Sequence, residues 1–399
     1  MAAFELWASP EPTVARIDAR TYRDQLAETG HQARDGDVDL IADLGVSGSR
    51  YPVLWEKTAP DDPARPDLRW ARARLEALRD AGVEPIVTLL HHGSGPPHTS
   101  LVAPDFPEKF AAYAQAVARA FPWVRRWTPI NEPLTTARFS ALYGHWYPNE
   151  RSDAAFGAAI VNQALAMQAA MERIRRENPS AEFVITEDLQ SFTLLDERVA
   201  SYVEHKRERM YLSIELMMGR IREGHPLFAY LTEKAQVAVA SLERLCAAPT
   251  PPDLVGWNYY PNSERALGVA ADGTAFNRPA REVQAIGAEP LLRAAYRRLG
   301  LPFGLSEVHC HADEAGRVSW LRERYDDLVL LAQEGLPVRM LGAWAAFGLV
   351  DWNSLLMRRD GVREDGIYTF ASADERPQPT AVAAELRALS RAQPVHAAS

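Results

Sequence analysis

Two glutamates follow short apolar runs at widely separated points of the sequence. Glu132 ends the segment Arg125–Glu132, written RRWTPINE, and Glu307 lies in the segment Phe303–His309, written FGLSEVH. Two carboxyl groups that face one cavity could cleave a glycosidic bond, because one can protonate the leaving oxygen while the other attacks the anomeric carbon or activates a water. The pair works only if its surroundings raise one pKa and leave the other carboxyl ionised.

Polar residues also close the other apolar runs, and several could assist such a pair. Asn131 precedes Glu132 and could bond a sugar hydroxyl beside the acid, while the cation of Arg50 could keep a partner carboxylate charged. Further candidates for contact with a substrate stand at the ends of the remaining runs: Glu11, His91, His92, Asn258, Tyr260, Asp351 and Trp352.

The residues above are spread over eight short apolar runs that alternate with longer segments of helical periodicity. Runs that are apolar at nearly every position indicate strands buried on both faces, as in a parallel sheet covered by helices. The predicted strands are Phe4–Ser9, Val46–Trp55, Val83–His92, Arg125–Glu132, Glu182–Asp188, Asp253–Tyr260, Phe303–His309 and Val338–Phe347. This alternation predicts an α/β fold, a single (β/α)8 TIM barrel. A doubly wound open sheet is less consistent with the sequence, because no G-x-G-x-x-G motif follows the first run.

Amphipathic segments fill the intervals between the predicted strands. The segment Asp67–Gly82 ends at a glycine, and its apolar face would consist of Leu68, Ala71, Leu75 and Leu78. The longest interval, residues 201–252, is mainly helical in pattern and would be an insertion in one domain covering residues 1–399. Because the loops after the strands form the active-site face of such a barrel, the insertion would either line a pocket or simply extend the helical layer.

The composition narrows the classes of partner. The 399 residues carry a formal net charge of −9, which argues against nucleic acid or an anionic membrane as the main partner and leaves a small molecule. Cys246 and Cys310 define neither a disulfide framework nor a thiolate metal cluster. The N-terminus shows no secretory leader, and we expect no apolar stretch long enough to cross a bilayer, so a cytoplasmic location is expected. The composition sets no oligomeric state.

The motif around Glu132 carries a resemblance to a known family. The letters TPINEP resemble the acid/base motif of the family-one retaining β-glycosidases, and the likeness extends roughly from Phe4 to Phe370. RYPVLWEKTAPD is similar to their Arg-containing second strand, PIVTLLHH to their third, LVGWNYYP to their sixth, and GLSEVH falls where their nucleophile motif falls. The chain also resembles a subgroup in which such a barrel precedes a sugar-nucleotide reductase domain, although no such domain is recognisable in these residues.

The resemblance implies roles for the central residues. Glu132 would be the acid/base and Glu307 the nucleophile, flanked by Arg50 and Tyr260. Asn131 would contact the hydroxyl next to the anomeric carbon. No cofactor is implied. The nucleophile motif departs from the usual Thr-Glu-Asn-Gly, because this chain reads SEVH there.

The residues that would hold the glycone depart further from the family pattern. The resemblance implies that His91 holds a glycone hydroxyl and that Trp344 forms the platform under the sugar. However, Glu11 stands where the family usually has Gln, His92 where it has Trp, and Asp351 where it has Glu. The catalytic pair therefore looks retained while the glycone pocket is rebuilt, and we expect the preferred sugar to differ from glucose.

Other interpretations stay open at this point. Glu132 could be a helix N-terminal carboxylate, Glu307 a structural ion-pair partner, and the remaining candidates ordinary core or rim residues. A metal-dependent barrel hydrolase could use His91, His309 and His311, since His-x-His is a common ligand pattern. A barrel that binds glycans or sugar nucleotides without turning them over is the alternative outside enzymes.

Overall fold

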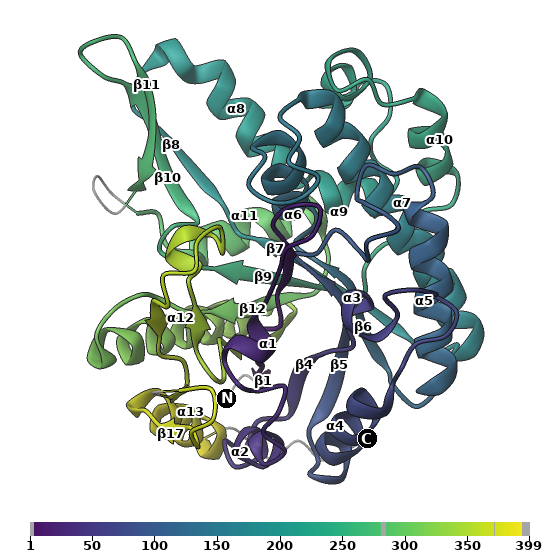
Figure 1. The fold of residues 1–399 in the computed structure, drawn as a ribbon. Coiled ribbons are helices and arrows are strands. Elements are labelled where there is room, and N and C mark those ends of the chain that lie inside the picture. The colour runs from purple at the N-terminus through teal and green to yellow at the C-terminus, as the bar shows by residue number, and fades with distance from the viewer. Residues whose placement is uncertain (1–3, 281–284, 371, 393–399) are drawn as a thin grey trace.

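The computed structural model describes residues 4–280, 285–370 and 372–392, and it forms a closed barrel of parallel strands (Figure 1). The barrel order is β1-β13-β12-β9-β7-β6-β5-β4, and pairing of Trp7 with Gly48 closes the ring between β1 and β4. The strands are β1 (Glu5–Ala8), β4 (Gly48–Pro52), β5 (Glu84–His91), β6 (Arg126–Asn131), β7 (Glu182–Asp188), β9 (Leu254–Tyr259), β12 (Phe303–Val308) and β13 (Val338–Ala343). The predicted (β/α)8 barrel is therefore confirmed, with one barrel strand in each predicted run.

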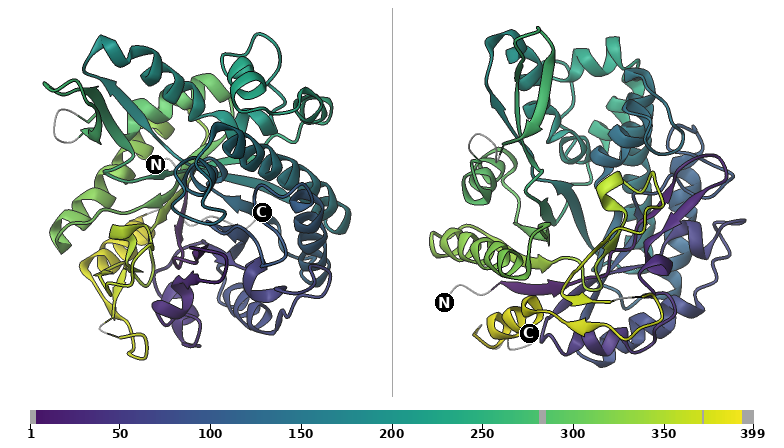
Figure 2. Two further views of the ribbon diagram at one scale, coloured as in Figure 1. Left: turned by 45° about the horizontal axis from the view of Figure 1, so that its top comes forward. Right: turned by 60° about the vertical axis from the view of Figure 1, so that its left-hand side comes forward.

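Helices cover the outside of the barrel, as the two views in Figure 2 show. They follow the strands as α2 (Asp37–Ala42), α4 (Arg69–Asp80), α5 (Phe106–Ala120), α7 (Asp153–Glu177), α9 (Leu212–Met217), α10 (Val239–Ala247), α11 (Ala288–Leu299), α12 (Glu314–Gln333) and α13 (Ala381–Ala392). In α4 the predicted apolar face is the buried one, because Ala71, Leu75 and Leu78 are fully covered. Apolar side chains at this spacing form one stripe, which can pack on the sheet.

The interior of the barrel is packed near its amino-terminal end. Trp7, Ile86, Val184, Leu254 and Met340 form one buried cluster, and they come from strands on several sides of the ring. Side chains from β5 and β9 can meet only inside the barrel, because β6 and β7 separate these strands in the sheet. This packing closes one end and leaves polar chemistry to the carboxyl ends of the strands.

Several predicted strands are too long at the carboxyl end. The run Val46–Trp55 was predicted as a strand, but β4 ends at Pro52 and Trp55 begins the helix α3 (Trp55–Thr58). The run Val338–Phe347 ends as a strand at Ala343. The reason is that the apolar residues continue past the sheet, because the loops at the barrel mouth are themselves buried: Trp55 and Phe347 are covered.

The interval after β7 contains more than helices. Residues 201–252 hold most of α8 (Ala200–Arg209), together with α9 and α10, as the pattern indicated. Beside them lies a three-stranded sheet that we did not predict, formed by β8 (Ser191–Leu194), β10 (Glu264–Val269) and β11 (Ala275–Pro279). Figure 1 shows this sheet extending away from the barrel next to α8. Strands of four to six residues that pair across a long sequence separation leave little periodic signal.

Short elements complete the mouth of the barrel. They are β2 (Val14–Arg16), β3 (Tyr22–Asp24), α1 (Gln25–Glu28), α6 (Pro133–Ala137), β14 (Leu349–Val350), β15 (Arg363–Glu364), β16 (Tyr368–Thr369) and β17 (Gln378–Pro379). The strands among them pair as the antiparallel hairpins β2–β3, β14–β15 and β16–β17.

The expectation that no segment could cross a bilayer needs a correction. The helix α7 is long and apolar enough by length and composition, with a mean hydropathy of 1.3 over its most apolar window. However, 72% of that window is buried inside the protein. Such burial is typical of a core helix whose apolar residues pack on its neighbours.

Candidate active site

Glu132 sits at a sharp turn between β6 and α6. Its backbone has φ +44° and ψ 61°, in the left-handed region that a glutamate rarely adopts. Its backbone N–H donates to the carbonyl of Thr186 at 3.0 Å, and Pro133 starts the helix that follows. Proline suits the first helical position because its φ is already helical and no N–H is lost there. The amide–acid–proline sequence therefore ends a strand and turns the carboxyl group into the barrel mouth.

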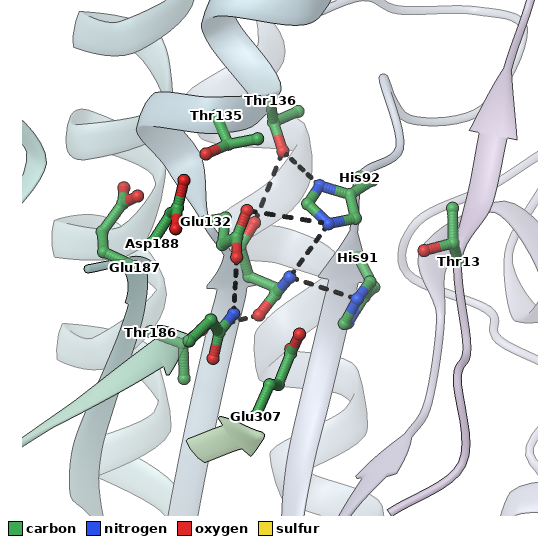
Figure 3. Close-up of polar contacts among 12 residues, drawn as sticks. Thr13, His91, His92, Glu132, Thr135, Thr136, Thr186, Glu187, Asp188 and Glu307 are labelled. Atoms are coloured by element: carbon green, nitrogen blue, oxygen red, sulfur yellow. Dashed lines mark hydrogen bonds and ion pairs between the residues drawn. The ribbon is translucent and has the colours of Figure 1, made fainter. Parts of the chain in front are cut away.

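The carboxyl of Glu132 is surrounded by other acids. Burial, together with the negative charges of Asp188, Glu307 and Glu187, raises the pKa of Glu132 well above its ordinary value. Asn258 opposes this effect by donating from Nδ2 to Glu132 Oε1 at 2.6 Å. Because Asn258 bonds Oε1, the acid proton is left for Oε2. Figure 3 shows Glu132 between His92 on one side and Asp188 on the other.

Glu307 has the opposite surroundings, because two donors hold its carboxylate. Arg50 Nη2 donates to Oε1, and the hydroxyl of Tyr260 donates to Oε2. The side chains of Arg50 and Glu307 are 1% and 4% exposed, so this ion pair is shielded from water. A buried cation and a phenol that both donate to one carboxylate hold it in a fixed orientation. The flanking positions that the resemblance implied for Arg50 and Tyr260 are the positions they occupy.

Asn131 joins the two histidines to Arg50. Its carbonyl oxygen accepts from Arg50 Nη1 and from the Thr186 hydroxyl, and its amide nitrogen lies 3.1 Å from His91 Nε2 and 3.3 Å from His92 Nε2. Arginine only donates, so the amide orientation is fixed, and both imidazoles must accept at Nε2. Both rings therefore carry their proton on Nδ1. The predicted sugar contact of Asn131 would have to displace one of these partners.

The two imidazoles are neutral for a physical reason. Burial, followed by the nearby His92 and Arg50, lowers the pKa of His91 well below its ordinary value. Burial and Arg50 lower the pKa of His92 to about 3. His92 Nδ1 lies 3.0 Å from the hydroxyl of Thr136, whereas the buried Nδ1 of His91 has no hydrogen-bond partner among the described residues. A buried donor without a partner is costly, so His91 Nδ1, like Arg50 Nε in the same network, still needs an acceptor among the described residues.

Glu11 and Trp344 lie beside His91. The ring of Trp344 is stacked on that of His91 with centroids 5.8 Å apart, and its indole N–H donates to Glu11 Oε2 at 3.2 Å. Glu11 Oε1 accepts from the backbone N–H of Thr13 at 2.9 Å and from its hydroxyl at 2.5 Å. Burial and the charge of Glu307 raise the pKa of Glu11 to about 7. The candidates for the glycone side are thus assembled in one place.

Asp351 and Trp352, the two candidates after β13, have different partners. Trp352 lies near His92, with ring centroids 5.7 Å apart. Asp351 instead accepts from Arg23 Nη2 and from the backbone N–H of Val362, both at 2.8 Å. The structure therefore brings Trp352 to the cluster, while the carboxylate of Asp351 ties the loop to another part of the mouth.

The histidines proposed for a metal site are divided between two places. His309 and His311 both approach Glu364 Oε2 at 3.5 Å, whereas His91 belongs to the Asn131 network. Within residues 4–280, 285–370 and 372–392, no three His, Cys, Asp or Glu side chains are grouped in a way that could hold a metal ion. The geometry gives the metal-dependent alternative no support.

Several residues of the cluster were missed in the sequence. Thr186 bonds Asn131, and Ser306 donates to Asn258 Oδ1 at 2.6 Å. Ser263 and, at 2.7 Å, Gln190 donate to Asp188, which the sequence already placed among the polar residues at the strand ends. A hydroxyl residue within an apolar strand, as in FVITED and FGLSEV, could have indicated Thr186 and Ser306. A strand side chain points either into the barrel or into the helical layer, so a polar one there needs a partner.

We expect the ion pair of Arg50 and Glu307 to be strongly coupled. Arg50→Met should destabilise the protein by about 3–5 kcal/mol, because it leaves a buried carboxylate unpaired. Glu307→Gln in the same chain should recover at least about 1 kcal/mol of that loss. Urea unfolding at pH 7 measures both changes. Arg69→Met is the control, since the Arg69–Asp67 pair is exposed and its loss should leave the unfolding free energy essentially unchanged. Strictly additive effects would contradict the coupling.

Glu11 should make stability depend on pH. The folded state keeps the proton of Glu11 up to about pH 7, whereas the ordinary pKa of an exposed glutamate is 4.5. The stabilisation is therefore complete below pH 4.5 and is lost as the pH rises to about 7. Glu11→Gln should remove roughly 3 kcal/mol of this fall between the two pH values.

Unfolding free energies of both proteins at pH 4.5 and pH 7 test this expectation. Part of the slope should remain in the variant, because burial also raises the pKa of Glu187 to about 7. Parallel pH profiles for the two proteins would show that Glu11 does not hold its proton in the folded state.

Comparison with known proteins places the chain among carbohydrate-active barrels. The structure of a β-glucosidase from Thermotoga maritima in complex with glucoimidazole superimposes with a TM-score of 0.78 at 16% identity, covering 98% of each chain. Among curated proteins, β-glucosidase 4 of Oryza sativa subsp. japonica is 30% identical over 152 residues, which is 35% of this chain and 32% of that protein. Klotho of Rattus norvegicus is 28% identical over 169 residues, which is 37% of this chain and 16% of Klotho. These alignments span less than a third of either curated relative.

The family itself is shown by a longer match. The sequence model of glycosyl hydrolase family 1 matches residues 11–282, which is more than half of the chain. The match contains Glu132 and Asn258 and ends before Glu307. The closed parallel barrel agrees with the solved family 1 β-glucosidase structures. The chain belongs to glycosyl hydrolase family 1.

Proposed function

We propose that this chain hydrolyses a β-glycosidic bond with retention of configuration, by double displacement through a covalent glycosyl-enzyme intermediate. One observation carries the proposal. Two buried carboxyl groups at the barrel mouth have opposite surroundings: a cation and a phenol hold Glu307, while burial and neighbouring acids surround Glu132. Such opposite surroundings are those expected of a nucleophile and an acid in one active site.

In the first step, Glu132 protonates the leaving oxygen while Glu307 attacks the anomeric carbon. Asn258 occupies Oε1 of Glu132, so Oε2 is the oxygen that delivers the proton. Arg50 and Tyr260 orient the attacking carboxylate, and neither blocks attack, because each carboxylate oxygen keeps a further lone pair. The oxocarbenium-like transition state forms beside this negative group.

In the second step, Glu132 must act as a base toward water. Formation of the glycosyl ester removes the negative charge of Glu307, and that charge is one cause of the raised pKa of Glu132. The pKa of Glu132 therefore falls once the intermediate has formed, and its carboxylate becomes able to accept a proton. The same two residues thus serve both halves of the reaction.

The residues on the glycone side support a preference for a sugar other than glucose. Glu11, His91 and Trp344 are interlinked here, and His91 offers an unpaired N–H. Above about pH 7, where Glu11 has lost its proton, its carboxylate can only accept hydrogen bonds, whereas the amide usual in the family also donates. A hydroxyl that loses its donor or acceptor costs roughly 1–3 kcal/mol, which is enough to change the preferred sugar.

The catalytic roles predict different effects for the two acids. Glu307→Ala should abolish turnover of every substrate. Glu132→Ala should spare the first step when the leaving group is already good, such as dinitrophenolate, and added azide should enter the vacated space and give a β-glycosyl azide. Reaction with a slow 2-fluoro glycoside, followed by mass spectrometry, should place the sugar on the peptide that contains Glu307.

Glu307→Gln and Glu132→Gln serve as shape-matched controls for these alanine variants. A label on another peptide would refute the role of Glu307. Proton NMR of the first-formed sugar reports the stereochemistry, and an inverted product would refute the retaining mechanism. Absence of any turnover by the folded wild-type protein would instead favour a barrel that binds glycans without cleaving them.

The rebuilt glycone side predicts a shifted substrate preference. In a panel of 4-nitrophenyl β-glycosides of hexoses, pentoses, deoxy sugars and uronic acids, kcat/KM for the glucoside should be at least about tenfold below that of the best glycone. At pH 8, Glu11→Gln should narrow this ratio, because the amide supplies a donor that the ionised carboxylate of Glu11 lacks. Efficient hydrolysis of cellobiose would contradict the expectation.

A further inference from the structure

A buried lysine lies in the insertion that follows β7. Lys206 belongs to α8, in the insertion after β7, and is 3% exposed. Its Nζ lies 5.2 Å from the ring centre of Phe192 and 4.9 Å from that of Tyr202. Tyr202 is 49% exposed, so the ammonium group is close to the molecular surface at this edge. In the part of the chain that the structure describes, Lys206 has no hydrogen-bond or ion-pair partner.

The charges around Lys206 are all of its own sign. Burial, followed by the cations Arg209, Arg138 and Arg265, lowers the pKa of Lys206 to about 7. A buried ammonium is normally paired with a carboxylate, because leaving water is costly for a charge without a partner. The contacts with two aromatic rings offset part of this cost, but they supply no negative charge.

Arg138 connects this lysine to the catalytic acid. Arg138 Nη2 donates to Thr135 Oγ1 at 3.0 Å, and its Nη1 donates to Gln190 Oε1 at 3.2 Å. Gln190 in turn donates to Asp188, whose charge acts on Glu132. The Nε of Arg138 is buried without a partner among the described residues, and the residue is 6% exposed.

Thr135, to which Arg138 donates, lies on the side of Glu132 away from Glu307 (Figure 3). The acid must stand beside the leaving oxygen, and the nucleophile must stand on the other side of the anomeric carbon. A leaving group that extends past Glu132 therefore approaches Thr135 and the guanidinium bonded to it.

We propose that Lys206 and Arg138 form a subsite for an anionic group, a phosphate or a carboxylate, on the leaving group of the substrate. The inference rests on the proposed glycosidase function and adds the chemical class of the aglycone. Both cations have unused donors, and each lacks an acidic hydrogen-bond partner among the described residues. An oxyanion would satisfy these donors and relieve the repulsion among the cations.

Binding of small probes tests the subsite without any turnover. Phenyl phosphate, benzoate and the neutral benzyl alcohol are titrated calorimetrically at low ionic strength into wild type and into Lys206→Met. We expect both anions to bind wild type and benzyl alcohol not to bind measurably. Lys206→Met should weaken anion binding by about tenfold or more, while Lys206→Arg should retain it. The tighter of the two anions identifies phosphate or carboxylate as the preferred group.

Further variants keep the test decisive. Arg138→Gln should also weaken anion binding, which covers the case that Lys206→Met does not fold. Lys109→Met is the matched control, because Lys109 pairs with Asp105 on α5, far from α8 in the sequence. The proposal is overturned if the anions and benzyl alcohol bind equally well. It is also overturned if both site variants bind the anions as wild type does, or if Lys109→Met loses as much affinity as the site variants.

The leaving-group assignment has its own readout. With the glycone found in the panel, wild type should prefer a 4-carboxyphenyl glycoside over its methyl ester by about tenfold in kcat/KM, and Lys206→Met should abolish that preference. Anion binding without such a preference would overturn the assignment to the leaving group. If the protein turns over no glycoside but still binds anions in a way that depends on Lys206, the glycosidase function is refuted and the anion site is supported.

Discussion

The guanidinium of Arg50 holds together the parts of the site that must stay fixed. It projects from β4 and donates to Glu307 on β12, to Asn131 on β6 and to Thr186 on β7. These strands lie on different sides of the ring, so one side chain spans the barrel mouth. Burying the cation of Arg50 is costly unless it is paired, and burying the carboxylate of Glu307 is costly unless a cation is present. The positions of Glu307, Asn131 and Arg50 therefore depend on one another.

Glu132 and Glu307 differ in their surroundings because the guanidinium of Arg50 reaches only one of them. It contacts Glu307 directly, whereas Glu132 has Asn258 as its donor and other acids as its charged neighbours. A neutral amide stabilises a carboxylate less than a guanidinium does. Two glutamates of one barrel mouth thus have opposite electrostatic surroundings, although the residue type is the same.

Burial explains which features could be predicted from the sequence. The barrel strands are covered on both faces, so each left an apolar run, and Glu132 and Glu307 stood out as acids at the ends of such runs. The pairing of Asp351 with Arg23 left no signal, because the two residues are 328 positions apart and each looks like an ordinary loop charge. The sheet of β8, β10 and β11 was missed for a similar reason, since its strands are short and partly exposed.

Asp188 couples Arg138 electrostatically to Glu132. The positive charge of Arg138 lowers the pKa of Asp188, while burial raises it by more. An ionised Asp188 in turn raises the pKa of Glu132. An anionic leaving group beside Arg138 would add its own negative charge near Glu132 and raise that pKa further. The substrate would thereby keep its acid protonated until the bond breaks. Departure of the leaving group would remove the negative charge near Arg138. The formation of the glycosyl ester removes the charge of Glu307 in the same step. Both changes lower the pKa of Glu132 just when it must accept a proton from water.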